Sequence, residues 1–397
     1  MVSRMPFLKR RGQHRSVVGG WKLLDWIVNR IKITMWLLAS MAVFLGAGCA
    51  GLGNEPREEA TYSAGDVGRR IVDFVQSSEA TGFSGAVLAA KDGKVVAAVG
   101  VGHADLAGKL RNTPGTLFEI ASATKQFTAA AVLRLVQEKR LGLDDSIAKH
   151  LPGVPENCRA ITVRHLLQHT SGIPGTNSRG GGADLGRVLP LFLRGGPKHP
   201  PGTHWEYWNQ GYSLLSEIVA RVAGEEYTAF CRGKLFTTAG MRATRFTGDA
   251  APARAVVAIG RSARGKPRSA LAHPYGSYGF QYRGMGGAVT TVWDLWRWDR
   301  ALRGDEVLGQ SAKAELFKPG LRDYALGWFV KKNARGQWVQ SHGGSVRGFV
   351  CQIRRYPKDN ACLFVLCNRD NLPVRKMADA LEKILFGKSA PAPVTAP

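Results

Sequence analysis

Runs of β-forming residues near both ends of this 397-residue chain constrain its fold most strongly. Residues 84–90 and 94–101 flank an Asp-Gly pair, the strongest short-range signal for a β-hairpin. The last third predicts further antiparallel strands at residues 328–330, 338–341, 349–355 and 361–367. The middle, about residues 126–280, consists mainly of helical and loop-forming sequence. This order predicts an α/β (α+β) fold in which both chain ends build one antiparallel sheet flanked by helices, with a mainly helical lobe inserted between them.

Ser122 opens an Ala-rich stretch without Gly or Pro, which predicts a helix of about four turns. Lys125 follows three residues later, so both side chains lie on one face of the first turn. The positive end of the helix dipole favours an alkoxide at Ser122, and the dipole and burial both lower the pKa of a lysine there. The spacing indicates a serine nucleophile with a lysine base. A second Ser-x-x-Lys pattern, Ser146 to Lys149, follows two aspartates and starts no long helix, so we interpret it as solvated surface.

Two further stretches carry side chains that could complete such a site. Tyr207 and Asn209 precede an apolar helix predicted at residues 213–222, and a phenol and an amide two residues apart can point into one cleft. A later predicted strand carries four candidate substrate-binding residues, His342, Gly343, Gly344 and Ser345. Glycine in a strand lets a substrate approach the backbone. Taken singly, the tyrosine is equally explained by packing, the asparagine as a helix cap and the histidine as an ordinary edge-strand residue.

In this order, Ser-x-x-Lys, Tyr-x-Asn and His-Gly-Gly resemble the three motifs of the penicillin-recognising serine hydrolases. The resemblance is closest to the branch that contains class C β-lactamases, DD-peptidases and related esterases. It extends over about residues 65–388 and includes supporting phrases at residues 84–102, 166–174, 201–203 and 284–296. The resemblance implies a β-lactamase/transpeptidase-like fold and a catalytic cycle that needs no metal or organic cofactor.

The resemblance also implies a role for each candidate residue. Ser122 would attack a carbonyl carbon and form an acyl-enzyme, with Lys125 accepting its proton. Tyr207, as a phenolate or through a shared hydrogen bond, would pass a proton to the leaving group, and Asn209 would hold the amide of the substrate. The backbone N–H groups of Ser122 and Ser345 would form the oxyanion hole, and water would then release the acyl group.

His342, Gly343 and Gly344 depart from the family pattern, because true β-lactamases and many DD-peptidases carry Lys-Thr-Gly there. A lysine supplies a permanent charge for a substrate carboxylate and lowers the pKa of its neighbours, whereas a neutral histidine does neither. This departure argues against efficient β-lactam hydrolysis and is compatible with esterase or D-amino-acid peptidase activity. Trp208 replaces a small residue, and we expect it to narrow the substrate cleft or to stack in it.

The sequence therefore predicts an exported serine hydrolase that acts on an ester, a β-lactam or a D-amino-acid amide, in a small molecule or a cell-wall peptide. The alternative is a non-catalytic, penicillin-binding-like protein that binds cell-wall peptides or has a regulatory role. A Ser-His-Asp α/β-hydrolase would carry a Gly-x-Ser-x-Gly elbow, which the sequence lacks. His165 and His169 have the i, i+4 spacing of a metal pair, but a leucine replaces the glutamate of zinc proteases. We therefore assign no metal site and interpret His169 as structural.

The chain carries a formal charge of +25, from 55 basic and 30 acidic residues. Outside residues 1–49 the charge is still +18 (47 basic against 29 acidic residues), spread without blocks of like charge or a basic-aromatic ladder. A nucleic-acid partner would require a clustered basic footprint, so we predict none. Weak affinity for anionic cell-wall polymers or lipid surfaces is the expected consequence of this charge.

The first 48 residues resemble an export signal. A basic segment of residues 1–32 precedes an uncharged run of 16 residues at 33–48, which is short for a membrane span. The run ends in Leu-Gly-Ala-Gly before Cys49 and resembles a bacterial lipobox, although Gly46 stands where an aliphatic residue is usual. We predict export to the periplasm or cell envelope and a membrane-tethered lipoprotein with its lipid on Cys49. An uncleaved single-span anchor is the alternative.

The predicted domain organisation follows from these segments. Residues 1–48 form the basic N-region and the signal or anchor, 49–64 a tether, 65–388 the hydrolase domain and 389–397 a disordered Pro/Ala tail. The sheet lobe takes about residues 65–125 and 281–388, and the helical lobe about 126–280. The six cysteines show no Cys-x-x-Cys spacing, which indicates buried free thiols rather than a zinc or redox motif, although Cys351 could approach Cys362 or Cys367 on one hairpin.

Overall fold

The protein is described by a computed structural model that covers residues 57–175, 184–263, 265–275 and 282–389. The chain divides after Pro56 into two units, and all of the described residues belong to the second. The predicted signal or anchor, Cys49, most of the tether and the tail beyond residue 389 lie outside the described residues. Within the described ranges, no helix is both long enough and apolar enough to cross a membrane.

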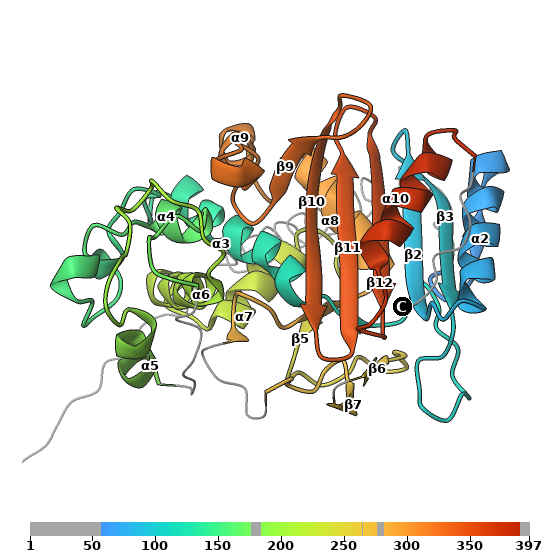
Figure 1. The fold of residues 1–397 in the computed structure, drawn as a ribbon, viewed down its shortest axis with the longest axis horizontal. Coiled ribbons are helices and arrows are strands. Elements are labelled where there is room, and N and C mark those ends of the chain that lie inside the picture. The colour runs from blue at the N-terminus through green and yellow to red at the C-terminus, as the bar shows by residue number, and fades with distance from the viewer. Residues whose placement is uncertain (1–56, 176–183, 264, 276–281, 390–397) are drawn as a thin grey trace, which may run out of the picture. The chain divides into compact units, whose positions relative to one another are not determined.

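A seven-stranded sheet forms the centre of the second unit, with the strand order β1-β3-β2-β12-β11-β10-β9 (Figure 1). Its N-terminal strands are β1 (Tyr62–Ser63), β2 (Gly85–Lys91) and β3 (Lys94–Val101). Its C-terminal strands are β9 (Phe329–Lys332), β10 (Trp338–Val346), β11 (Phe349–Tyr356) and β12 (Ala361–Cys367). All neighbours are antiparallel, and β2 pairs with β12, so the two ends of the chain join inside one sheet. The predicted fold class is confirmed.

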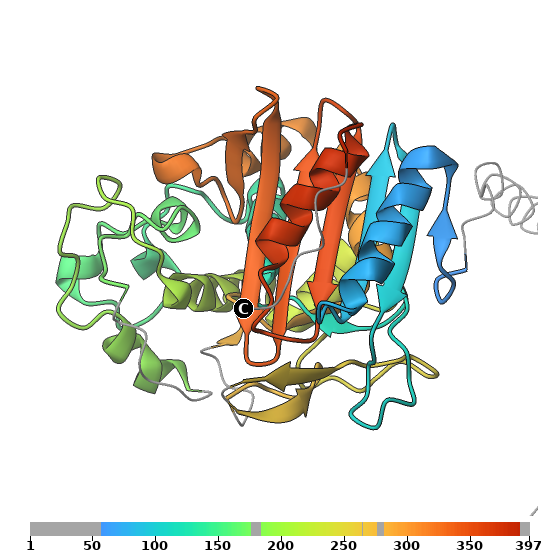
Figure 2. The same cartoon turned by 45° about the vertical axis from the view of Figure 1, so that its right-hand side comes forward.

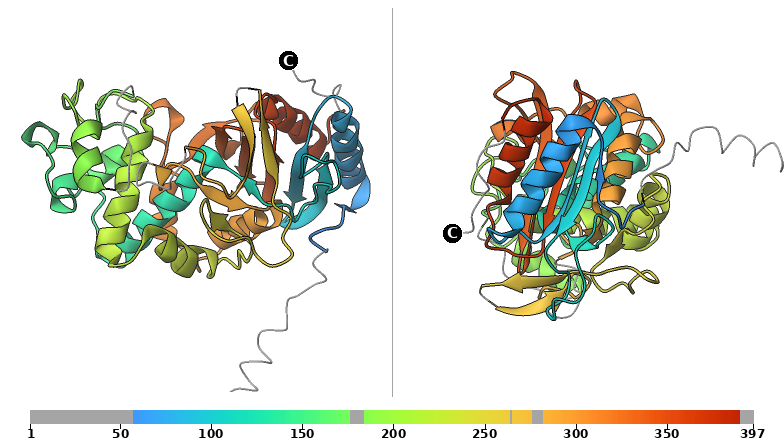
Figure 3. Two further views of the ribbon diagram at one scale, coloured as in Figure 1. Left: turned by 90° about the horizontal axis from the view of Figure 1, so that it is seen from below. Right: turned by 90° about the vertical axis from the view of Figure 1, so that its right-hand side faces the viewer.

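Helices cover both faces of the central strands. Helices α2 (Gly65–Glu79) and α10 (Val374–Leu385) lie side by side on one face, as Figure 2 and the right-hand view of Figure 3 show. Val87 and Val365 pack beneath them, whereas Leu88 and Phe364 belong to the core on the opposite face. That face contacts α8 (Val292–Arg303). Because both faces are covered, β12 is buried along its whole length and is apolar throughout.

The remaining helices lie to one side of the sheet, where the left-hand view of Figure 3 shows most of them in green. They are α3 (Lys125–Gln137), α4 (Val163–Leu167), α5 (Leu185–Phe192), α6 (Asn209–Ala223), α7 (Tyr227–Phe230), the π-helical turn η4 (Cys231–Phe236) and α9 (Gln310–Leu316). A small sheet of β4 (Phe118–Glu119), β8 (Ala288–Thr290) and β5 (Arg245–Phe246) connects this side to the main sheet. Strand β4 leads directly to the predicted nucleophile.

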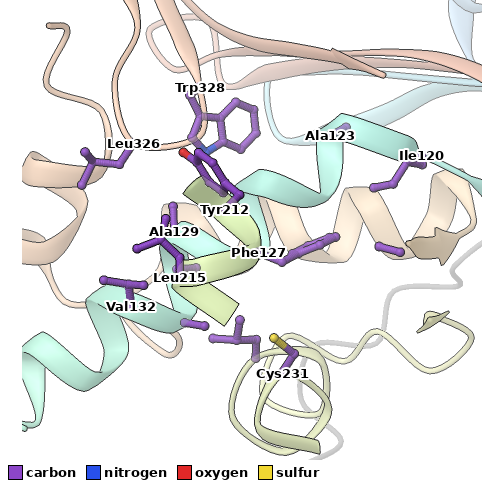
Figure 4. Close-up of a cluster of buried hydrophobic side chains, with 14 of the residues drawn as sticks. Ile120, Ala123, Phe127, Ala129, Val132, Tyr212, Leu215, Cys231, Leu326 and Trp328 are labelled. Carbon is purple, nitrogen blue, oxygen red and sulfur yellow. The ribbon is translucent and has the colours of Figure 1, made fainter. Parts of the chain in front are cut away.

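Helix α3 is buried along most of its length, and Figure 4 shows the apolar side chains that surround it. Phe127 packs edge-to-face against Phe236 and Trp298, with ring centroids 5.0 Å apart in each pair. The alanines of α3 leave room for α6 to approach, because they add little volume between the helices. The predicted helix is present, but it begins at Lys125, and the residues before it form the 3₁₀ turn η1 (Ala121–Thr124).

Strands β6 (Ile259–Ser262) and β7 (Gly265–Ser269) form a hairpin in the region that the sequence predicted to be mainly helical and loop-forming. Their residues are mostly Gly, Arg, Lys, Pro and Ser, so no alternation of apolar side chains marks them as strands. Gly260 allows the hairpin to lie against Phe349, since an added Cβ would come within 2.4 Å of that ring. Every cysteine in the described part of the chain is a buried free thiol, so Cys351 forms no disulfide.

Candidate active site

Ser122 lies in η1, the turn that connects β4 to α3. Ala121, just before it, has a φ of 46°, a left-handed conformation that costs a residue with a side chain roughly 1–2 kcal/mol. Strained backbone of this kind is concentrated at functional sites. Ser122 lies at the wall of a cavity of about 1020 Å³.

Lys125 is completely buried one turn after Ser122. Its Nζ donates hydrogen bonds to Oδ1 of Asn209 at 2.8 Å and to the main-chain oxygen of Met285 at 2.9 Å. A neutral amine has two N–H donors and one lone pair, so these two acceptors use both donors and leave the lone pair free. Burial lowers the pKa of Lys125 well below its ordinary value. A shift in this direction favours the neutral amine, which is the form that a general base requires.

Tyr207 lies between this amine and the serine. Its hydroxyl is hydrogen-bonded to the Ser122 side chain, and Nζ of Lys125 lies 4.9 Å from the centre of its ring. Burial raises the pKa of the Tyr207 phenol, an effect that the hydrogen bond with Ser122 only partly offsets. The phenol is therefore neutral near pH 7, which favours a shared hydrogen bond over the phenolate that the sequence also allowed.

His342 lies on β10 and is held as a neutral ring by two neighbours. Its Nδ1–H donates to the main-chain oxygen of Gly343 at 2.6 Å, and its Nε2 accepts from the Tyr324 hydroxyl at 3.2 Å. Burial and the nearby Lys125 lower the pKa of His342 to about 3, against the opposing effect of the bond to Gly343. The position that carries a lysine in Lys-Thr-Gly motifs thus has no positive charge at neutral pH.

Gly344 and Gly343 are adjacent on β10 but have different surroundings. A Cβ on Gly344 would lie 2.0 Å from the main-chain oxygen of Ile120, just before the turn that carries Ser122. A Cβ on Gly343 would meet nothing closer than 3.3 Å. Gly344 is therefore required so that β10 can pass close to η1, a reason that differs from the predicted approach of a substrate.

The cavity brings together six of the eight residues predicted to form the catalytic and substrate-binding site. They are Ser122, Tyr207, His342, Gly343, Gly344 and Ser345. The other two, Lys125 and Asn209, do not line the cavity; Lys125 is completely buried and Asn209 is partly exposed at the start of α6. Sequence reasoning missed the Met285 oxygen, because a main-chain acceptor leaves no mark in residue identity, and the Tyr324 hydroxyl, which stands in no recognisable motif.

Trp208 corrects one expectation, because it neither narrows the cleft nor stacks in it. Its side chain is 1% exposed and packs against Gly211 in the core. Its backbone N–H donates to Nδ1 of His169 at 3.2 Å. The indole is buried because the chain turns at this residue into α6, which directs the neighbouring Tyr207 toward the cavity.

The two histidines with metal-pair spacing have separate structural partners. His165 accepts a hydrogen bond from the Thr162 N–H at 3.2 Å and belongs to the capping box of α4. His169 is buried with a φ of 57°, and its ring centroid lies 4.2 Å from that of Tyr207. Burial lowers the pKa of His169 well below its ordinary value. Its contacts place it as support for the Tyr207 segment.

The second Ser-x-x-Lys pattern lies at the surface. The hydroxyl of Ser146 donates to the main-chain oxygen of Arg159. The Lys149 side chain is 64% exposed and forms an ion pair with Asp145 at 2.8 Å. This exposed, ion-paired lysine therefore lacks the complete burial and the uncharged hydrogen-bond acceptors that surround Lys125.

Comparisons with known proteins identify the family of this chain. The profile of the family described as Beta-lactamase matches residues 70–386. Penicillin-binding protein 4* of Bacillus subtilis is 30% identical over 338 residues, which cover 78% of this chain and 74% of that protein. The putative penicillin-binding protein PbpX of the same organism is 33% identical over 296 residues, covering 74% of this chain and 72% of that protein.

Solved structures show the same fold. The octameric penicillin-binding protein homologue from Pyrococcus abyssi superposes with a TM-score of 0.71 and 26% identity, covering 83% of this chain and 79% of that one. The D-amino acid amidase from Ochrobactrum anthropi SV3 has a TM-score of 0.67 at 23% identity, with 81% and 98% of the two chains covered, and demonstrates similarity of fold alone. The chain therefore belongs to the Beta-lactamase family of serine hydrolases.

Proposed function

We propose that this chain is an exported serine hydrolase that forms an acyl-enzyme at Ser122 and acts on an ester or a D-amino-acid amide. The observation that carries this proposal is the hydrogen bonding of Lys125. Its buried amine donates to Asn209 and to the Met285 oxygen, and its lone pair remains available for a proton. A serine on the same helical turn, hydrogen-bonded to a neutral phenol, completes the minimum set for acyl transfer.

The reaction proceeds in two halves. The Oγ of Ser122 bonds to the carbonyl carbon while its proton passes to the Lys125 amine, and the N–H groups of Ser122 and Ser345 stabilise the oxyanion. The bond to the leaving group then breaks as Tyr207 delivers a proton to the departing oxygen or nitrogen and takes up the proton held by Lys125, which leaves the amine neutral again. In the second half, water attacks the acyl carbonyl and loses a proton to the Lys125 amine. The bond to Oγ of Ser122 then breaks, the acid is released, and the proton returns from Lys125 to Ser122.

The neutral ring of His342 supports esters and D-amino-acid amides over β-lactams. It offers no permanent charge to a carboxylate beside the reacting bond, because its pKa is held at about 3. The similarity to proteins named as penicillin-binding proteins supports a site that penicillins can acylate, even where turnover is slow.

A hydrolysis panel tests this proposal with wild type and Ser122→Ala side by side. It contains p-nitrophenyl acyl esters, D-amino-acid anilides, D-Ala-D-Ala peptides and nitrocefin, together with a fluorophosphonate probe followed by mass spectrometry. We expect ester or anilide turnover and a covalent adduct on wild type, both absent from Ser122→Ala. If wild type hydrolyses none of the substrates and forms no adduct with any acylating probe, the result would instead support the non-catalytic binder.

We also propose export and lipid attachment at Cys49, on the basis of the basic segment, the apolar run and the lipobox-like sequence that precede it. The segment that follows Cys49 would then hold the hydrolase domain, whose main sheet begins with β1 (Tyr62–Ser63), at the membrane surface. Growth of a bacterial host on radiolabelled palmitate, with the full chain and with Cys49→Ala, tests this. Equal labelling of both proteins would contradict it.

A further inference from the structure

The cavity beside Ser122 extends far beyond the predicted site, along the face of the main sheet that packs against α10, and residues of β9, β10, β11 and α10 line it. Alternate residues of β10 point to this face, and Val339, Ser341, Gly343 and Ser345 all line the cavity. Their partners on the neighbouring strands, such as Lys331 opposite Val339, line it as well. We call this extension the sheet groove. Val339 and Ser345 are six residues apart, so the groove is roughly 20 Å long at ~3.3 Å per strand residue.

Basic side chains gather along the sheet groove. The exposed ones are Lys331, Lys332, Arg375, Lys383 and Lys388. Among the residues that the structure describes, no carboxylate forms an ion pair with any of these five. These cations are therefore open to a partner.

The acidic residues that line the described part of the groove are already engaged. Asp379 and Glu382 both bind the guanidinium of Arg354, at 2.5 Å and 2.8 Å. Arg335, near the end of α10, is paired with Asp359 at 2.6 Å. The charge left over in the groove is therefore positive, and it comes mainly from lysines.

The end of the groove beside the nucleophile has a different character. Gly343, Ser345 and Gln352 line it with uncharged polar groups, and the adjacent His342 is neutral. The free lysines lie farther away, around Lys331 and the last turn of α10. Except for Arg375 in the first turn of α10, the groove thus changes along its length from an uncharged reacting end to a cationic far end.

We propose that the sheet groove binds an anionic chain that is part of the substrate and extends from the bond attacked by Ser122. This inference rests on the proposed hydrolase function and names its substrate class. The uncharged end receives the reacting group, and carboxylate or phosphate groups farther along the chain meet the lysines. A chain that spans about 20 Å contains about six extended units, so the substrate is an oligomer or polymer rather than a free amino-acid derivative.

An anionic membrane surface is a poorer partner for the same charges. The lysines border a concave groove whose floor is the sheet, and a flat bilayer cannot follow that floor. A flexible chain can lie in the groove and pair with several cations at once.

Matched esters test this proposal. An oligopeptide ester carries an extension of about ten glutamates or about ten glutamines, long enough to exceed the groove. One pair bears the extension on the acyl side and a second pair on the alcohol side. In one of the two pairs we expect kcat/KM at low salt to be about tenfold higher for the glutamate ester than for the glutamine ester. At high salt, the ratio of the two kcat/KM values should approach one.

Charge-reversal variants locate the effect. Lys331→Glu/Lys383→Glu is expected to abolish the preference for glutamate, and Lys331→Gln/Lys383→Gln to reduce it. Lys109→Glu/Lys234→Glu changes the net charge equally, at exposed lysines that do not line the cavity, and is expected to keep the preference. The proposal would be overturned if wild type hydrolysed the glutamate and glutamine esters with the same kcat/KM in both pairs. It would also be overturned if the control variant lost the preference for glutamate to the same extent.

Two further measurements separate this inference from its alternatives. Sedimentation with phosphatidylglycerol vesicles tests the membrane: vesicle binding that depends on Lys331 and Lys383, without a glutamate preference, would assign the groove to lipid instead. Fluorophosphonate labelling of Ser122 and hydrolysis of a short neutral ester test the underlying function. If these succeed while the glutamate preference is absent, the groove proposal alone fails.

Discussion

The Nζ atom of Lys125 and the Oδ1 atom of Asn209 lie 2.8 Å apart, although 84 positions separate the two residues in the chain. The bond joins the first two predicted motifs, between the completely buried Lys125 and the partly exposed Asn209. Because the amide oxygen is uncharged, it orients the amine while stabilising an ammonium much less than a carboxylate would. The asparagine can therefore serve the base directly, in addition to the predicted contact with a substrate amide.

Replacement of Asn209 by aspartate tests this relationship. A carboxylate 2.8 Å from Nζ would favour the charged lysine and raise its pKa. We expect Asn209→Asp to lower kcat/KM at pH 7 by about 10²-fold or more and to move the pH–rate profile toward alkaline pH. Asn209→Ala, which adds no charge, is the control and is expected to lower the rate without the alkaline shift. Identical pH profiles for the two variants would contradict this role.

Removal of the proposed base should distinguish the two Ser-x-x-Lys patterns. Lys125→Ala is expected to lose about 10²–10⁴-fold in kcat because proton transfer from the serine is lost. Lys149→Ala removes a surface ion pair with Asp145 and is expected to retain nearly all activity. Steady-state kinetics on one ester is sufficient, and equal losses would show that the nucleophile has been assigned to the wrong motif.

The depressed pKa of His342 predicts an acid-dependent loss of stability. Its pKa is about 3 in the folded protein and near 6.5 when the ring is exposed, so only the unfolded chain takes up this proton between those values. The contribution of the neutral ring to stability is therefore fully present above about pH 6.5. As the pH falls toward 3, the free energy of unfolding decreases by at most about 1.4 kcal/mol per pH unit. The free energy of unfolding, measured with urea, should differ less between pH 7 and pH 5 for His342→Gln than for wild type. The same difference in both proteins would show that this ring does not contribute.

The two glycines of the third motif should respond differently to alanine. A Cβ at Gly344 would collide with the Ile120 oxygen at 2.0 Å, so Gly344→Ala must push β10 away from η1. We expect a cost of about 1–3 kcal/mol in unfolding free energy together with loss of activity. Gly343→Ala, whose Cβ would meet the flexible end of the Gln352 side chain at 3.3 Å, is expected to keep its stability within about 0.5 kcal/mol. Denaturant unfolding of both variants checks the contrast.

The sequence predicted the main sheet because strand formation depends on local features. The Asp-Gly turn and the alternating apolar runs identify β2, β3, β11 and β12 with little error in their bounds. Hairpin β6–β7 was missed because packing on Phe349, rather than any pattern of its own residues, holds it in place. Sequence patterns record such tertiary contacts poorly.

The candidate site was predictable to the extent that it consists of motifs. Ser122, Tyr207 and His342 could be named from the order of three motifs, and the structure gathers them around one cavity. The orientation of Trp208 could not be predicted, since a large side chain beside a cleft can point in or out and burial in the core decided it. The contact of the Tyr324 hydroxyl with His342 could not be predicted for a related reason, because only the fold brings the two side chains together.

Pairing of β2 with β12 makes assembly of the sheet dependent on the last strand to be synthesised. A polypeptide that stops before Ala361 leaves the hydrogen-bonding groups of β2 open along one edge, where another copy can pair with them. Truncated products should therefore aggregate instead of forming a smaller stable domain. The protein is therefore expected to be soluble only when its chain extends through β12.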